Sequence, residues 1–181
     1  MRLTNSLQRK LHHRTLRKRF NTTKILPKIN PKEAKTIALL FDATKNETRK
    51  IVESFAQKLR NKGKIVTLFA FFNGKEKPDW AFKFFNEKET NWYGIPKGET
   101  VETFLNTTFD MMYCLFNEPH LPLEYVGAMA QAHFKAGSYT DDLTRYDLMI
   151  DTQNADLEEL IHQIEFYLTK IGRSENELST V

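Results

Sequence analysis

Short apolar runs alternate with segments of helical periodicity, and this alternation constrains the fold of the 181-residue chain more than any other feature. Residues 36–42 (TIALLFD) form a continuous apolar run between polar residues, which predicts a buried strand. Residues 46–62 carry an apolar stripe on one helical face, and Gly63 follows as a stop signal. Residues 64–72 (KIVTLFAFF) predict a second strand. A strand, a helix and a strand in this order form a βαβ unit, so the two strands are expected to be parallel.

The rest of the chain continues the alternation. Further strands are predicted over residues 110–116, 134–138 and 146–151, with a short edge strand over 91–95, and helices over 99–108, 121–133 and 155–171. Residues 75–90 fit either a short helix around Trp80 to Phe85 or an aromatic-rich loop. We therefore predict an α/β fold, a three-layer sandwich of Rossmann-like or flavodoxin-like type with a mainly parallel sheet. This single domain spans residues 36–172, after a basic N-terminal helix (1–20) and a Pro-punctuated linker (21–35), and before a polar tail (173–181).

Composition and motifs exclude several classes of protein. The single cysteine, Cys114, rules out an internal disulfide framework and a multi-cysteine zinc site, and its apolar strand predicts a core residue. The longest apolar runs are far shorter than the ~20 residues that a membrane span needs. No glycine-rich phosphate loop follows the first strand, and no P-loop or G-x-S-x-G pattern occurs. We therefore expect no metal and no cofactor, and we favour a protein that is not an enzyme.

Charge is divided unevenly along the chain. Residues 1–32 contain ten Lys and Arg and no Asp or Glu, whereas the whole chain has a net charge of +4. Such asymmetry predicts an anionic partner, such as RNA, the ribosome, another nucleic acid or a lipid surface. The candidate nucleic-acid contacts are Arg9, Lys10, Arg14, Arg17, Lys18 and Arg19. The alternatives are a merely solvated helix, a helix folded back onto the acidic body, and a transit peptide.

The apolar residues of this first segment fall into two sets. Leu3, Leu7 and Leu11 recur every four residues, whereas Leu16 and Phe20 share another face. Leu16 lies about 140° round the helix from Leu11. Either the helix breaks near His12 and His13, or its halves contact different surfaces, with the second half docked on the body or on a partner.

Polar residues at the predicted strand ends are candidates for a ligand crevice, because open α/β sheets bind ligands at the carboxyl ends of their strands. The crevice candidates are Asp42, Lys45, Ser138 and Asp141, and the weaker catalytic candidates are Asp42, Glu118 and His120. The alternative, which we favour, is that Asp42 is a turn residue that accepts backbone N–H bonds near the start of the helix.

Aromatic residues are densest between positions 80 and 93, where lysines are interspersed. The cluster consists of Trp80, Phe82, Phe84, Phe85, Trp92 and Tyr93. It fits a stacking platform for single-stranded nucleic acid or, alternatively, cover for a sheet edge.

Several stretches carry a resemblance to a known family. FDMMYCLFNEP, AQAHFKAGSY, DLMID and the closing FYLTKI resemble an uncharacterised family of the Bacteroidota, known only as a domain of unknown function. The resemblance implies a bacterial origin and assigns no catalytic residue. Residues 109–137 are also similar in topology to the amino-terminal half of heptosyltransferase-type glycosyltransferases.

The function expected from these features is non-catalytic binding of RNA, the ribosome or other nucleic acid through the basic N-terminal helix. One alternative is a small enzyme or nucleotide-binding protein that uses the crevice near Asp42. Another is peripheral attachment to an anionic membrane. A protein partner for the α/β body and a cytoplasmic location are also expected.

Overall fold

The computed structural model is an α/β fold built on a six-stranded sheet in which every pair of neighbouring strands is parallel. It describes residues 2–20, 26–74, 78–140, 146–151 and 156–171, with the side chains of the first helix described from Ser6 to Arg19. The strands are β1 (Thr36–Asp42), β2 (Ile65–Phe71), β3 (Lys83–Phe85), β4 (Thr108–Leu115), β5 (Gln131–Ser138) and β6 (Leu148–Ile150). The helices are α1 (Arg2–Phe20), α2 (Asn46–Asn61), α3 (Glu99–Asn106), α4 (Leu121–Met129) and α5 (Leu157–Ile171), with short 3-10 helices η1 (Pro31–Glu33) and η2 (Glu87–Glu89).

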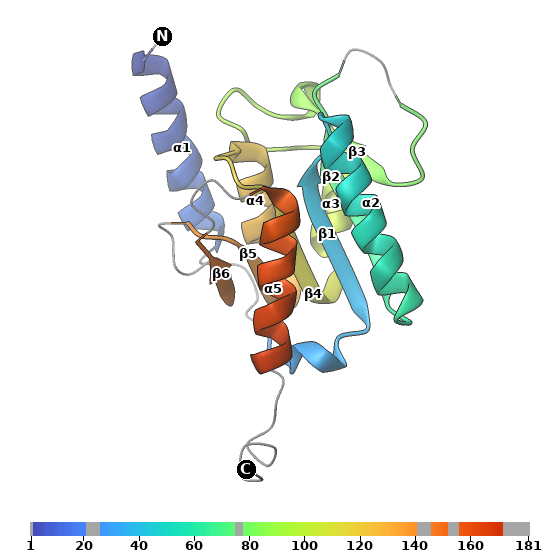
Figure 1. The fold of residues 1–181 in the computed structure, drawn as a ribbon. Coiled ribbons are helices and arrows are strands. Elements are labelled where there is room, and N and C mark those ends of the chain that lie inside the picture. Colours follow the sequence, from blue (N-terminus) through green and yellow to red (C-terminus); the bar gives the residue numbers. More distant parts are fainter. Residues whose placement is uncertain (1, 21–25, 75–77, 141–145, 152–155, 172–181) are drawn as a thin grey trace.

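The strand order is β3-β2-β1-β4-β5-β6, which is the order of a Rossmann fold. The chain first adds β2 and β3 on one side of β1 and then adds β4, β5 and β6 on the other side, so the switch point of the topology lies between β1 and β4. In folds of this kind, ligands bind in the crevice outside the strand ends at the switch point. The strands run upward in Figure 1, so their carboxyl ends meet at the top of the view, where the amino end of α1 also lies. The predicted α/β fold is confirmed, and the sheet is parallel throughout the described strands.

Two apolar layers flank the sheet. The cluster that includes Phe55 of α2 and Ile164 of α5 covers one face, and the cluster that includes Phe104 of α3 and Val126 of α4 covers the other. Strand residues alternate between the two layers, because successive side chains of a strand point to opposite faces. The result is the three-layer sandwich predicted from the sequence (Figure 1).

Three predicted elements differ from the structure. Residues 91–95 form a tight turn instead of an edge strand, because the Asn91 side chain accepts the N–H groups of Tyr93 and Ile95, and Gly94 has a φ of 79°. The segment predicted as a short helix or a loop contains no helix at residues 80–85: residues 80–82 are irregular, and residues 83–85 form β3, which pairs with β2. The helix predicted over 121–133 ends at Met129, because residues from Gln131 onward hydrogen-bond along β4 instead.

Helix α1 is continuous and packs on α4, so the predicted break near His12 and His13 does not occur. Leu16 is only 2% exposed and packs with Ile95, Tyr125 and Met129. Leu7, on the other stripe, is 53% exposed. The alternative in which the second half of the helix docks on the body is therefore correct.

Candidate functional site

Helix α1 is fixed to the body by its polar residues as well as by Leu16. Gln8 donates its side-chain amide to the carbonyl of Trp92 at 2.8 Å, and His12 donates Nδ1–H to the carbonyl of Tyr93 at 3.0 Å. Gln8, His12 and Leu16 recur every four residues, so they share one face of the helix. This face is turned to the body, and the basic residues at the intervening positions are left on the faces beside it.

A pocket of about 1030 Å³ lies between α1 and the carboxyl ends of β4 and β5. We call it the basic pocket. The described residues that line it are Ser6, Arg9, Lys10, His13, Arg14 and Arg17 of α1, Phe116–Pro119 after β4, Glu124 of α4, Ser138–Thr140 at the end of β5, and Tyr146. Helix α1 therefore forms one wall, and the strand-end loops form the other.

The cations of the basic pocket are brought together by helical spacing. Arg9, His13 and Arg17 recur every four residues, and Lys10 and Arg14 form a second such row beside them. The side chains of these lysines and arginines are exposed, and within the described part of the chain none lies within 4 Å of a carboxylate. Glu118 and Glu124 also line the pocket, so four cations face two carboxylates. The described lining of the pocket therefore has a net positive charge.

The other two basic candidates lie differently. Arg19 donates to the hydroxyl of Tyr125, and its guanidinium lies over the ring at 5.8 Å from the centroid, so it joins α1 to α4. Lys18 is exposed and does not line the basic pocket. The structure thus assembles four of the six predicted cations around one concave surface.

A second pocket, of about 560 Å³, lies over the carboxyl ends of β1 and β2. We call it the polar pocket. Its described lining consists of Gln8, Asp42, Thr44, Phe71, Asn73, Glu87, Thr90, Asn91, Trp92, Gly94 and Pro119–Pro122. It adjoins the switch point between β1 and β4, where the fold favours ligand binding.

His120 begins α4 in the polar pocket. Its Nδ1 accepts the N–H of Leu123, so the ring acts as the N-cap of the helix, and it packs at 4.4 Å on the ring of Phe71. Burial lowers the pKa of His120, whereas the Asp42 carboxylate acts in the opposite direction. A neutral ring suits this contact, because Nδ1 can accept a hydrogen bond only when it carries no proton.

The remaining predicted site residues are separated. Asp42 accepts the N–H of Thr44 at 2.8 Å, as expected of a turn residue, and it also lines the polar pocket. Glu118 and Ser138 line the basic pocket instead, so Glu118 does not share a pocket with His120. Lys45 is exposed at the N-cap position of α2 and lines neither pocket. Asp141 lies outside the described residues.

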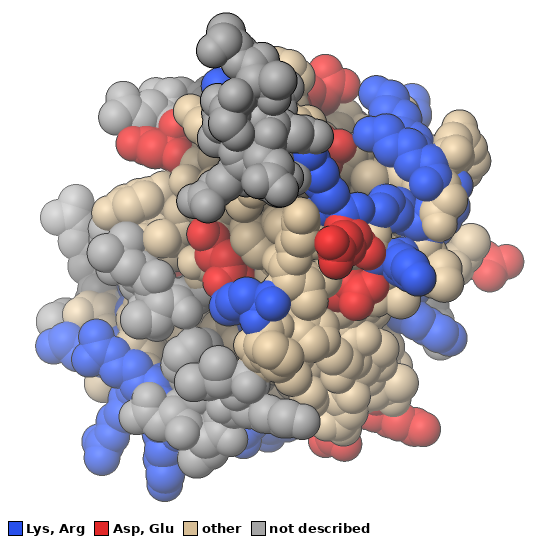
Figure 2. All heavy atoms as spheres, turned by 90° about the horizontal axis from the view of Figure 1, so that it is seen from below, with Lys and Arg blue, Asp and Glu red and all other residues tan. Residues whose placement is uncertain are grey.

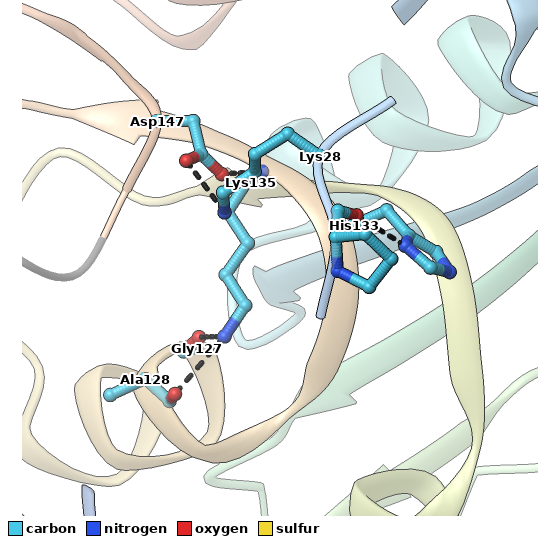
Figure 3. Close-up of polar contacts among 7 residues, drawn as sticks. Lys28, Gly127, Ala128, His133, Lys135 and Asp147 are labelled. Carbon is cyan, nitrogen blue, oxygen red and sulfur yellow. Dashed lines mark hydrogen bonds and ion pairs between the residues drawn. The ribbon is translucent and has the colours of Figure 1, made fainter. Parts of the chain in front are cut away.

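Lys135 is a buried cation that the sequence reasoning missed. Its ammonium donates to the carbonyls of Gly127 and Ala128, both at 3.0 Å, where α4 ends (Figure 3). The backbone N–H of Lys135 donates to Asp147, which pairs with Lys28. A lysine between Phe134 and Ala136 in a predicted strand was the available signal. Because the helix end is negative, a cation there satisfies its free carbonyls.

Cys114 is a core residue, as predicted. It is 1% exposed, and burial raises the pKa of its thiol to about 11. Such a thiol is a poor nucleophile at neutral pH, because the reactive form is the thiolate.

The described surface at the opposite end of the molecule carries both basic and acidic residues. Figure 2 shows the protein from below, at the amino ends of the strands, with lysine and arginine at several separate places and acidic residues between them.

The described residues contain no cluster of three His, Cys, Asp or Glu side chains placed to hold a metal ion. None of their helices has the length and apolar character needed to cross a bilayer.

The strand order and the two pockets define the class of the protein: an α/β protein of Rossmann-like topology with two pockets at the strand ends, one of them walled by a basic helix. The chain belongs to DUF6913, a family of unknown function, whose model matches residues 4–171 and so includes most of α1. No curated protein and no solved structure shows significant similarity to it. The bacterial origin and the similarity to heptosyltransferase-type enzymes stay predictions.

Proposed function

We propose that the protein is a non-catalytic nucleic-acid-binding module whose basic pocket holds the phosphate backbone. The observation that carries this proposal is the pairing of one concave surface with four exposed cations from α1. Phosphate contacts from lysine and arginine supply most of the sequence-independent affinity of nucleic-acid-binding proteins.

The arrangement favours phosphate in two further ways. Arginine presents a planar fork that matches two phosphate oxygens at once, and three of the four cations are arginines. Ser138 and Thr140 contribute hydroxyl groups on the opposite wall. A phosphate between the two walls would therefore meet donors from both sides.

Salt dependence tests the proposal. Affinity for a labelled oligonucleotide is measured by fluorescence anisotropy over a series of salt concentrations. If all four cations contact phosphates, the slope of log K against log salt is about −2.8 for a single strand and about −3.6 for a duplex. Replacing Arg9 and Arg14 by Glu should roughly halve the slope, since two of the four contacts are then lost.

A matched variant distinguishes binding at the basic pocket from a general effect of the net charge of the protein. Lys50 and Lys58 are exposed on α2, on the far face of the sheet, and their replacement by Glu changes the net charge by the same amount. The α2 variant should keep the wild-type slope. Equal weakening by the two double variants, or binding that does not respond to salt, would reject the proposal.

Binding to lipid vesicles tests the membrane alternative. Full-length protein is mixed with vesicles that contain anionic lipid and with vesicles that do not. Partition onto the anionic vesicles with no measurable oligonucleotide binding would contradict the nucleic-acid proposal.

A further inference from the structure

The basic and polar pockets lie next to each other at the carboxyl edge of the sheet. Pro119, in the loop after β4, lines both of them. Helix α1 also contributes to both, with Gln8 in the polar pocket and the neighbouring Arg9 in the basic pocket. The pockets lie at the carboxyl ends of neighbouring strands, because β1 pairs with β4.

The two pockets differ in charge. The described residues that line the polar pocket include no lysine or arginine, but they include the carboxylates of Asp42 and Glu87. A phosphate is therefore favoured in the basic pocket and repelled from the polar pocket. Carboxylate and amide groups suit the edges of bases, whose amino groups donate hydrogen bonds, and the polar pocket holds the amides of Asn73 and Asn91 as well.

An exposed aromatic ring lies in each pocket. Trp92 is 60% exposed in the polar pocket, and Tyr139 is 52% exposed in the basic pocket. Trp92 is held by the bond from Gln8 to its carbonyl and by an edge contact with Tyr93 at 5.4 Å. Exposed aromatic rings beside a cationic groove are the arrangement on which unpaired bases stack.

The rest of the aromatic cluster has a different role. Trp80, Phe82 and Phe84 pack on one another and on the core beside β2 and β3, as cover for the sheet edge. The first part of the cluster is therefore structural, whereas Trp92 is exposed in the polar pocket.

We propose that the nucleic acid bound by this protein is single-stranded, with its backbone in the basic pocket and unpaired bases stacked on Trp92 and Tyr139. This inference rests on the proposed function and names its ligand more closely. In a duplex the bases are stacked inside the helix, so their faces cannot reach either ring.

The experiment compares three labelled probes of equal length in fluorescence anisotropy at fixed salt: a single strand, a strand without bases, and a duplex. The single strand should bind most tightly, because only it combines phosphates with free bases. Trp92→Ala and Tyr139→Ala should each weaken single-strand binding about 5- to 150-fold, since stacking on one ring is worth that factor. Neither should change binding of the strand without bases.

The control is Tyr167→Ala. Tyr167 is 43% exposed on α5, on the far face of the sheet, and lines neither pocket. This variant should bind all three probes as wild type does. Thermal unfolding of each variant shows whether the fold is retained, and the probe without bases shows whether the basic pocket is intact.

The outcomes distinguish the two proposals. Equal affinity for the strands with and without bases, still dependent on Arg9 and Arg14, would overturn the single-strand inference and leave the proposed function in place. Competition by a mononucleotide at the same concentration as the strand would also overturn it, in favour of a nucleotide site. Absence of salt-dependent binding to every probe would overturn both.

Discussion

Lys135 gives the stability of the protein a predicted dependence on alkaline pH. Burial lowers the pKa of its ammonium group from 10.5 to about 8. Between these two values the unfolded chain keeps the proton and the folded chain has released it. The free energy of unfolding therefore rises with pH across this window. The stability gained in this way is lost again as the pH falls through the pKa of Lys135 in the folded protein.

The size of the effect follows from the shift. Each pH unit within the window is worth about 1.4 kcal/mol, so the full rise is about 3 kcal/mol. Two buried acids act in the other direction at higher pH: burial raises the pKa of the Cys114 thiol from 9.0 to about 11 and raises that of Tyr113 well above its ordinary value. The contribution of Lys135 to the free energy of unfolding is therefore measured as the difference between wild type and a variant that lacks Lys135. Both proteins keep the two buried acids.

The assay is urea unfolding of wild type and Lys135→Met at several pH values from neutral to about 10. The variant loses the two bonds to the carbonyls of α4, which shifts its stability by a nearly constant amount. The wild type should gain up to about 3 kcal/mol on the variant as the pH rises. Lys50→Met, at an exposed position of α2, should run parallel to wild type. Parallel curves for wild type and Lys135→Met would refute the reasoning.

Three other perturbations test the attachment of α1 and the start of β1. Leu16→Ala removes a buried side chain and should destabilise the attachment of α1 by about 2–5 kcal/mol. The backbone amides of α1 should then exchange hydrogen faster, whereas those of β1 should not. Unchanged protection of the α1 amides would contradict this expectation. Gly94→Ala should lower the melting temperature, because its φ is 79° and an added Cβ would lie 2.7 Å from that of Leu121; an unaltered melting curve would contradict it. Asp110→Asn should make unfolding less sensitive to acid, because the backbone N–H of Thr36 lowers the pKa of this carboxyl below 3.8 and its stabilisation is lost as the pH falls through that lowered value. Equal acid sensitivity in urea unfolding would argue against this role.

The sequence predicted the sheet well, because its central strands are buried on both faces. Residues 36–42 read as one apolar run for this reason, and β1 has the predicted bounds. Elements whose limits depend on distant partners were predicted less well. The end of α4 was predicted too late in the sequence, because residues 131–133 belong to β5 and pair with β4. Periodicity along the chain does not reveal such pairing.

The candidate site was predicted in its parts but not in its assembly. The cations of α1 and the strand-end residue Ser138 were both identified, yet only the docking of α1 brings them to one pocket. That docking depends on His12 and Leu16, which meet a turn about 80 residues away in the sequence. A single sequence carries little information about such long-range pairing. Trp92 could not be told from its packed neighbours for the same reason.

The packing of α1 against α4 has a consequence for how the site works. A ligand that touches both walls of the basic pocket is bound most tightly when the helix is in place, so it must in turn favour that position by the same free energy. Attachment of the helix and occupancy of the groove then behave as a single linked equilibrium. Loosening of this one helix would provide a route for release, with no need for the sheet beneath it to change shape.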